Sequence, residues 1–214
     1  MTAGDRPSLA GLMGVVLGGG RSHRFGSPKA HAPVGGVPLA ARSRNALSEV
    51  VGRVVLVAGD AELAEALTLE DRPDRTPGLG PVGGLSTALH WARDEGFDGV
   101  LLLACDLPLV PPNLLRAIAD RFDGSCAIIP ESPGPLGLEP LCAAYPVSCL
   151  AAVDEASGLP DRSMATLLAG LTVRPVPLLD VSALGAPAEL FLNVNRPEDR
   201  ERAERILARR EGGE

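Results

Sequence analysis

Residues 11–30, GLMGVVLGGGRSHRFGSPKA, join an apolar run directly to a glycine-rich, basic loop. Glycine interrupts the apolar run and no strong cationic segment precedes it, so it is typical of a buried strand and not of a signal peptide. The consecutive glycines at 18–20 let the backbone approach a ligand closely and turn its N–H groups toward an anion. Ligands of parallel α/β sheets lie at the carboxyl ends of strands. The segment therefore predicts an anion-binding loop, with a flexible turn as the alternative.

Short apolar runs alternate with amphipathic runs over the rest of the chain, which is typical of a sheet covered by helices. We expect an α/β three-layer sandwich with a mostly parallel central sheet, in which DGVLLLACD, 98–106, is a central strand. We expect further strands at 11–19, 53–59, 126–132, 141–145 and 191–195, with an extended run at 172–179. We expect helices at 38–50, 61–67, 113–122, 149–156, 162–171 and 197–210, and one more that carries Leu85, Ala88, Leu89 and Ala92 at helical spacing.

The composition is that of a globular protein, because 45% of the 214 residues are apolar and the 25 glycines and 20 prolines are scattered along the chain. This length favours a single domain over residues 1–214. A net charge of −7 argues against nucleic acid and membrane surfaces as partners, since both are anionic. No stretch approaches the roughly 20 apolar residues of a membrane helix. We expect a soluble, cytoplasmic protein.

The four cysteines, at 105, 126, 142 and 149, form no CxxC pair, and the first three fall in apolar, strand-like runs. Free thiols, as in a cytoplasm, are the prediction. Zinc binding is the alternative, although the three histidines show no ligand spacing with the cysteines.

A small basic cluster follows the first expected strand, with Arg21, His23, Arg24 and Lys29 inside nine residues. Lys29 is the only lysine beside 19 arginines, and a compact ammonium acts as a point charge on phosphates. The loop fits neither GxxxxGK[ST] nor GxGxxG, so neither an ordinary P-loop ATPase nor a typical dinucleotide-binding dehydrogenase is indicated. The cluster predicts a local anion site on an otherwise acidic protein.

Two carboxylates and two carboxamides are further candidates. Asp106 ends the strand expected at 98–106, where a carboxylate suits Mg²⁺ held together with substrate phosphates; capping of the following turn is the alternative. Asp74 lies in the turn-rich stretch 71–84 and is an ordinary turn residue on sequence grounds alone. Asn193 and Asn195 lie near the end of the strand expected at 191–195, where turn formation is the alternative.

The glycine-rich loop closely resembles the signature of nucleotidyltransferases with a GT-A-like fold. The residues that carry this resemblance are Leu17, Gly18, Gly19, Gly20, Arg24, Phe25, Gly26 and Lys29. The order Asp74, two residues, PGLGP and two small residues before a helix looks like the base-recognition segment of molybdenum cofactor guanylyltransferases, the MobA family. The likeness continues at 104–108, 139–145, 161–168 and 191–199, so it covers nearly the whole chain. Departures from the family pattern include Pro28, Glu139, which stands where histidine is often found, and Arg162–Ser163 in place of paired arginines.

The resemblance implies a Rossmann-like, GT-A-like nucleotide-binding fold that uses GTP, Mg²⁺ and molybdopterin to make molybdopterin guanine dinucleotide. The nucleotide-binding residues that it implies are Leu17, Gly18, Gly19, Lys29, Asp74 and Asp106. It also implies that Arg24, Lys29 and Asp106 are the catalytic residues and that Asp106 is the metal ligand. From their expected place at a strand end, Asn193 and Asn195 are expected to face the pterin phosphate or to complete the metal shell. In that family the residue matching Asp74 contacts guanine, whose adjacent N–H donors suit a carboxylate that accepts two hydrogen bonds.

The expected reaction is in-line attack by the terminal phosphate of molybdopterin on the α-phosphorus of GTP, with pyrophosphate as the leaving group. One alternative is a transferase of the same fold that uses CTP or GTP on another phosphorylated acceptor. Another is a non-catalytic nucleotide-binding carrier for molybdoenzymes. A molybdoenzyme or a cofactor chaperone is the expected protein partner.

Overall fold

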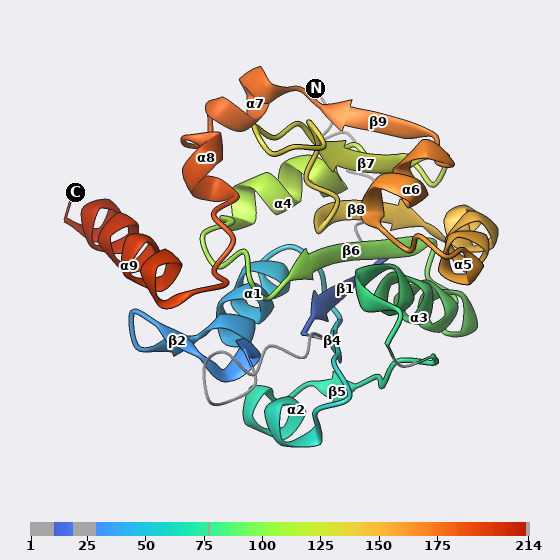
Figure 1. The fold of residues 1–214 in the computed structure, drawn as a ribbon, viewed down its shortest axis with the longest axis horizontal. Coiled ribbons are helices and arrows are strands. Elements are labelled where there is room, and N and C mark those ends of the chain that lie inside the picture. Colours follow the sequence, from blue (N-terminus) through green and yellow to red (C-terminus); the bar gives the residue numbers. More distant parts are fainter. Residues whose placement is uncertain (1–10, 19–28, 77, 213–214) are drawn as a thin grey trace, which may run out of the picture.

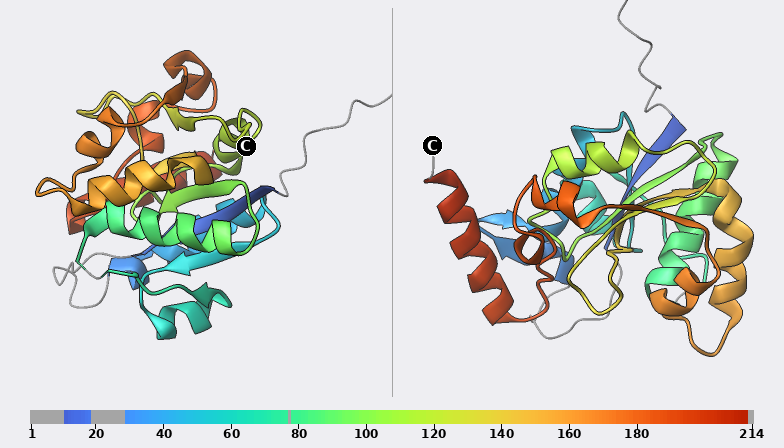
Figure 2. Two further views of the ribbon diagram at one scale, coloured as in Figure 1. Left: turned by 90° about the vertical axis from the view of Figure 1, so that its right-hand side faces the viewer. Right: turned by 90° about the horizontal axis from the view of Figure 1, so that it is seen from above.

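The computed structural model describes residues 11–18, 29–76 and 78–212. Within them, a twisted seven-stranded sheet lies between two layers of helices (Figure 1). Figure 2 shows the layers from two further sides, with helices on both faces of the sheet. The predicted three-layer α/β architecture is therefore confirmed.

The strands of the sheet are mostly parallel. Their order across the sheet is β5 (Glu70–Asp71), β4 (Val54–Val57), β1 (Leu12–Leu17), β6 (Gly99–Ala104), β8 (Cys142–Pro146), β7 (Ala127–Pro130) and β9 (Val173–Val176). β8 runs antiparallel to both of its neighbours, while the other pairs are parallel. β8 follows β7 without an intervening helix, so the chain reverses direction instead of crossing over. A separate antiparallel pair, β2 (Pro33–Val34) and β3 (Val37–Pro38), was not predicted.

Alternating side chains of each central strand supply both halves of the core. In β1, Leu12 and Val16 pack on one face of the sheet, and Met13 and Val15 pack on the other. The first face is covered by α1 (Leu39–Ser48), α2 (Ala61–Leu67), α4 (Pro112–Ala119), α7 (Leu178–Ser182), α8 (Pro187–Leu190) and α9 (Pro197–Glu211). The second face is covered by α3 (Gly80–Asp94), α5 (Leu150–Gly158) and α6 (Met164–Ala169). Two 3₁₀ helices, η3 (Lys29–His31) and η4 (Val147–Cys149), complete the elements of the described residues.

The carboxyl-terminal third differs from the sequence prediction at two places. The extended run expected at 172–179 forms β9 but ends at Val176, and helix α7 begins at Leu178. The prediction of a strand at 191–195 is wrong, because this segment is a loop. The amides of Phe191 and Leu192 donate to carbonyls of the α8 turn, so they are not available to a ladder. Asn193 and Asn195 therefore lie on a loop and not at a strand end.

One buried polar contact ties a covering helix to the end of the central strand. Ser43 of α1 is 1% exposed, and its hydroxyl donates to the carbonyl oxygen of Ala104 at 3.3 Å. This bond fixes α1 against the end of β6, next to Asp106. No helix in the described part of the chain is long and apolar enough to span a bilayer.

Candidate functional site

The candidate site lies where the parallel strands β1, β4 and β6 end at the same edge of the sheet. In the register of the sheet, Leu17 faces Val57 on one side and Ala104 on the other. The pairing continues past the strand ends, because Gly18 N donates to the Val57 carbonyl and Cys105 N to the Leu17 carbonyl, both at 3.0 Å. This edge is where parallel α/β sheets bind ligands. Lys29, which opens η3, and Asp106, two residues beyond β6, are both brought to it.

Three distant segments meet around the ammonium of Lys29. Its side chain is 10% exposed, and its Nζ donates to Asp106 Oδ2 at 2.8 Å and to Asn195 Oδ1. Asn195 Nδ2 donates in turn to Asn193 Oδ1 at 2.6 Å. The partners of Lys29 are 77 and 166 positions away in sequence. The structure thus joins four of the sequence-predicted site residues in one chain of polar contacts.

The loop that carries the asparagines is held at both sides. Val194 N donates to the backbone carbonyl of Asp106 at 2.9 Å, which ties the loop to the exit of β6. Asp199, in the first turn of α9, accepts hydrogen bonds from the amides of Asn195 and Arg196 at 3.0 and 2.9 Å. A carboxylate in this position also satisfies the free N–H groups at the start of a helix. The carboxamides therefore have a fixed backbone beside Asp106.

One oxygen of Asp106 has no hydrogen-bond partner among the described residues. Oδ2 accepts from Lys29, whereas Oδ1 is buried and unpaired. Leaving a buried acceptor unsatisfied is costly, and a hard cation that takes oxygen ligands would satisfy it. No group of three or more His, Cys, Asp or Glu side chains that could hold a metal occurs in residues 11–18, 29–76 and 78–212. The site therefore fits a divalent cation that would take one carboxylate oxygen from the protein and further oxygens from substrate phosphates.

Glu139 adds a second carboxyl group to the surroundings of Asp106. Burial raises its pKa to about 7; the Leu141 amide, which donates to its Oε1 at 3.3 Å, lowers the pKa, and the charge of Asp106 raises it further. The sequence had marked Glu139 only as a departure from the family pattern. The fold gives the reason to consider it, since it places this partly buried carboxyl group close enough to Asp106 for their charges to interact.

Glu139→Gln is expected to change how stability depends on pH. The folded-state pKa lies above the ordinary value of 4.5, so the folded wild type binds the extra proton, and this stabilisation is lost as the pH rises through about 7. Between pH 5 and pH 8 the unfolding free energy of the wild type should fall by about 2 kcal/mol relative to the variant. Urea unfolding of metal-free protein measures both profiles, and parallel profiles would show that Glu139 stays ionised in the fold.

Asp74 lies on the segment between β5 and α3, close to the end of β1. Burial, followed by the charge of Asp71, raises the pKa of its half-buried carboxyl group. A Cβ atom added at Gly84 would lie 2.3 Å from Leu17 Cδ1 and 3.8 Å from Asp74 Oδ1. Because Gly84 has no side chain, the Leu17 side chain can lie against α3 at this point, on the side where the Asp74 carboxylate also lies. Arg24 and Gly19, two other predicted site residues, lie outside the described residues.

The four cysteines are buried and free. Cys105, next to Asp106, is the one nearest to the candidate site, and burial raises the pKa of its thiol to about 12. A thiol with this pKa is not a nucleophile near neutral pH. Cys105 is therefore not a candidate nucleophile of the site.

Comparisons with known proteins identify the family of this chain. The MobA-like NTP transferase domain family matches residues 14–176. Two proteins named probable molybdenum cofactor guanylyltransferase are similar to this chain. The one from Pelotomaculum thermopropionicum is 32% identical, covering 91% of this chain and 92% of that protein. The one from Haloferax mediterranei is 35% identical, covering 88% and 91% respectively.

Among solved structures, molybdopterin-guanine dinucleotide biosynthesis protein A from Archaeoglobus fulgidus superposes with a TM-score of 0.76. It is 27% identical, and the match covers 92% of this chain and all of that chain. The family model, the sequence relatives and the solved structure all indicate the same family. The chain therefore belongs to the family of MobA-like NTP transferases.

Proposed function

We propose that this protein transfers GMP from GTP to molybdopterin, forming molybdopterin guanine dinucleotide and pyrophosphate. The observation that carries the proposal is the contact of Lys29 with Asp106 and Asn195 at the carboxyl edge of a parallel sheet. The family and the names of its relatives supply the substrate class. We further propose that residues 1–214 form a single nucleotidyltransferase domain.

The reaction needs little acid–base chemistry from the protein. The terminal phosphate of molybdopterin attacks the α-phosphorus of GTP in line, and the bond from this phosphorus to the β-phosphate bridging oxygen breaks as pyrophosphate leaves. A phosphate nucleophile is already ionised near neutral pH, so no general base is required. Catalysis then consists of positioning two anions and neutralising their repulsion. Lys29 and Arg24 are proposed to supply positive charge for this purpose. The expectation that the N–H groups of 17–19 all hold the nucleotide is revised, because Leu17 belongs to β1 and the Gly18 N–H donates to the Val57 carbonyl at 3.0 Å. The N–H of Gly19, which lies outside the described residues, is the one that we propose for the nucleotide.

Asp106 is the proposed ligand of Mg²⁺, through its buried Oδ1, which has no hydrogen-bond partner among the described residues. The bound ion would neutralise phosphate charge and orient the phosphates for displacement. Lys29 keeps the other carboxylate oxygen engaged at 2.8 Å, which fixes the orientation of the carboxylate. Asn193 and Asn195 are proposed to face the phosphate of molybdopterin or to complete the metal shell. A molybdoenzyme or a cofactor chaperone is the proposed recipient of the product.

Asp74 is the proposed guanine-recognition residue. Guanine presents a ring N–H and an exocyclic amino group side by side, and a carboxylate accepts from both. The pairing edge of cytosine offers no such pair of donors. The place of Asp74 near Leu17 and Gly84, at the carboxyl end of β1, supports a role at the base end of the nucleotide.

Asp74→Ala is expected to lower the preference for GTP over CTP about 10- to 100-fold, because it removes two hydrogen bonds to a charged acceptor. The ratio of kcat/KM values for the two nucleotides measures the effect. Asp123→Ala is the matched control: it removes an exposed carboxylate that precedes β7 and pairs with Arg174 at 2.9 Å. An unchanged ratio in Asp74→Ala would remove Asp74 from base recognition.

The reaction itself is tested by pyrophosphate release from each of the four nucleoside triphosphates with Mg²⁺, with and without molybdopterin. Release from GTP that depends on molybdopterin is the expected result. If release depends on a different phosphorylated acceptor, that acceptor and not molybdopterin is the substrate. GTP binding without any release would indicate a nucleotide-binding carrier in place of an enzyme.

A further inference from the structure

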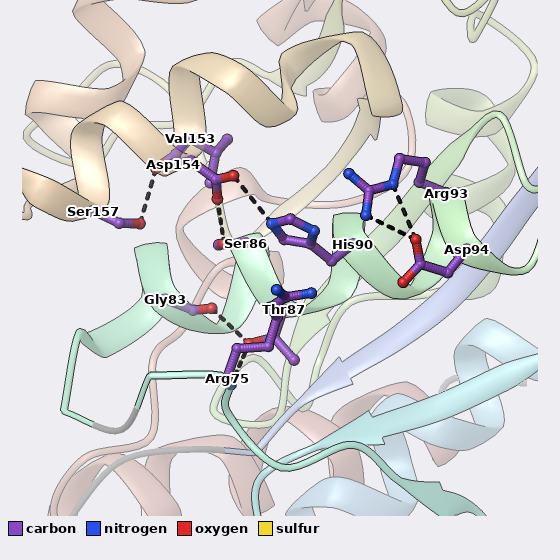
Figure 3. Close-up of polar contacts among 10 residues, drawn as sticks. All are labelled: Arg75, Gly83, Ser86, Thr87, His90, Arg93, Asp94, Val153, Asp154 and Ser157. Atoms are coloured by element: carbon purple, nitrogen blue, oxygen red, sulfur yellow. Dashed lines mark hydrogen bonds and ion pairs between the residues drawn. The ribbon is translucent and has the colours of Figure 1, made fainter.

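A buried hydroxyl on α3 contacts the backbone beside Asp74. Thr87 is 0% exposed, and its Oγ1 accepts a hydrogen bond from Arg75 N at 3.0 Å (Figure 3). The same hydroxyl donates to the carbonyl oxygen of Gly83, one turn earlier in α3, also at 3.0 Å. The hydroxyl hydrogen is therefore committed to the helix, and an oxygen lone pair is left for the loop.

The amide that Thr87 binds belongs to the peptide group between Asp74 and Arg75. A hydrogen bond to this N–H sets the orientation of the peptide plane, and this plane helps to set the direction of the Asp74 side chain. A buried N–H without an acceptor is costly, so the loop would turn this peptide toward another partner if the hydroxyl were absent. Thr87 thus controls a backbone group directly attached to the proposed base-recognition residue.

Arg72, on the other side of Asp74, is also held against α3. Its guanidinium carbon lies 3.3 Å from the centroid of the Trp91 ring, and its NH2 group contacts Glu70 and Glu95, each at 2.7 Å. Trp91 follows Thr87 by four positions, so both side chains lie on the same face of the helix. Helix α3 therefore fixes the segment 72–75 at two points that flank Asp74.

We propose that Thr87 is a positioning residue for guanine specificity, because its hydroxyl holds the Asp74–Arg75 peptide so that the Asp74 carboxylate is aligned with guanine. This inference rests on the proposed role of Asp74 in binding GTP. Thr87 does not touch the nucleotide itself. It acts on the choice of base and not on phosphoryl transfer, so its effects should appear in the comparison of purines and not in kcat.

The test compares GTP with ITP, which lacks the exocyclic amino group of guanine. Thr87→Val keeps the shape of the side chain but removes the acceptor, and Thr87→Ala removes the hydroxyl with less bulk. Both variants are expected to reduce the wild-type ratio of KM values, ITP over GTP, about fivefold, with kcat for GTP within about twofold of the wild type. Thr87→Ser keeps the hydroxyl and should retain the wild-type ratio.

Ser157→Ala is the matched control. The hydroxyl of Ser157 donates to the Val153 carbonyl in α5 at 2.8 Å, which is the same bond to the preceding turn that Thr87 makes (Figure 3). Within the described part of the chain, Ser157 makes no hydrogen bond to a loop. Its ITP/GTP ratio should stay at the wild-type value, and urea unfolding of each variant checks that the comparison is made on folded protein. A wild-type ratio in both hydroxyl-free variants of Thr87, or loss of the ratio in Thr87→Ser, would overturn the inference.

Asp74→Ala separates this inference from the proposed function. If Asp74→Ala abolishes discrimination between GTP and ITP while both hydroxyl-free variants of Thr87 keep it, Asp74 reads the base without help from Thr87. If Asp74→Ala itself leaves discrimination intact, the proposed guanine contact is wrong, and the inference about Thr87 falls with it.

Discussion

Asp106→Asn is expected to lower kcat for GMP transfer about 10²- to 10³-fold. The substitution replaces a carboxylate oxygen with an amide nitrogen that donates and cannot bind a cation. It also removes the negative partner that Lys29 contacts at 2.8 Å. Pyrophosphate release at saturating GTP and molybdopterin, measured over a range of Mg²⁺ concentrations, gives kcat and the Mg²⁺ midpoint together. The midpoint should rise as kcat falls, because the proposed ligand atom is altered.

Asp180→Asn is the control for this charge change. Asp180 is a half-exposed carboxylate of α7 that pairs with Arg121 at 2.7 Å. Its loss alters the net charge by the same amount, away from the candidate site, and should leave kcat and the Mg²⁺ midpoint within about twofold of the wild type. Full turnover of Asp106→Asn at an unchanged midpoint would show that Asp106 is a turn residue and not a metal ligand.

Lys29→Met is expected to have an effect of similar size on catalysis, about 10²- to 10³-fold in kcat, because it removes a positive charge proposed to lie on the phosphates. It should also destabilise the fold by about 2 to 3 kcal/mol, since the side chains of Lys29 and Asp106 are only 10% and 20% exposed and the carboxylate would be left without its cation. Urea unfolding and pyrophosphate release measure the two effects separately.

The double variant Lys29→Met with Asp106→Asn tests the origin of that destabilisation. Both charges of the Lys29–Asp106 pair are removed in it, so it should be more stable than Lys29→Met alone while staying inactive. Arg205→Met, which removes an exposed cation from α9, should change neither property by a measurable amount. A double variant less stable than Lys29→Met would mean that packing, and not charge, accounts for the loss.

Much of the architecture could be predicted because it depends on local pattern. The apolar run at 98–106 became β6, the period-3.6 residues from Leu85 to Ala92 became part of α3, and the helix expected at 61–67 has the bounds of α2. The prediction of a strand at 191–195 was wrong because of contacts that the sequence does not reveal. Leu192 and Val194 are buried at alternate positions, as in a strand. The backbone of the segment instead continues from α8, and its amides donate to carbonyls of α8 and of Asp106.

The candidate site could be anticipated residue by residue but not as a set of contacts. Lys29 can be recognised in the sequence as the only lysine, and Asp106 as a carboxylate that follows a buried strand. The partnership of Lys29 with Asn195 spans 166 positions, and no local pattern encodes it. Thr87 was missed because a threonine inside an apolar helix face gives no signal until the loop that it binds is placed.

The loop between α8 and α9 has a consequence for synthesis of the protein. The contact that completes the surroundings of Lys29 comes from Asn195, whose backbone is in turn held by Asp199. A nascent chain that has already formed β1 and β6 still lacks this contact until the start of α9 has left the ribosome. Closing so long a loop is slow relative to local folding. We therefore expect a ribosome-bound fragment that ends before residue 190 to form much of the sheet and yet to remain without an assembled site.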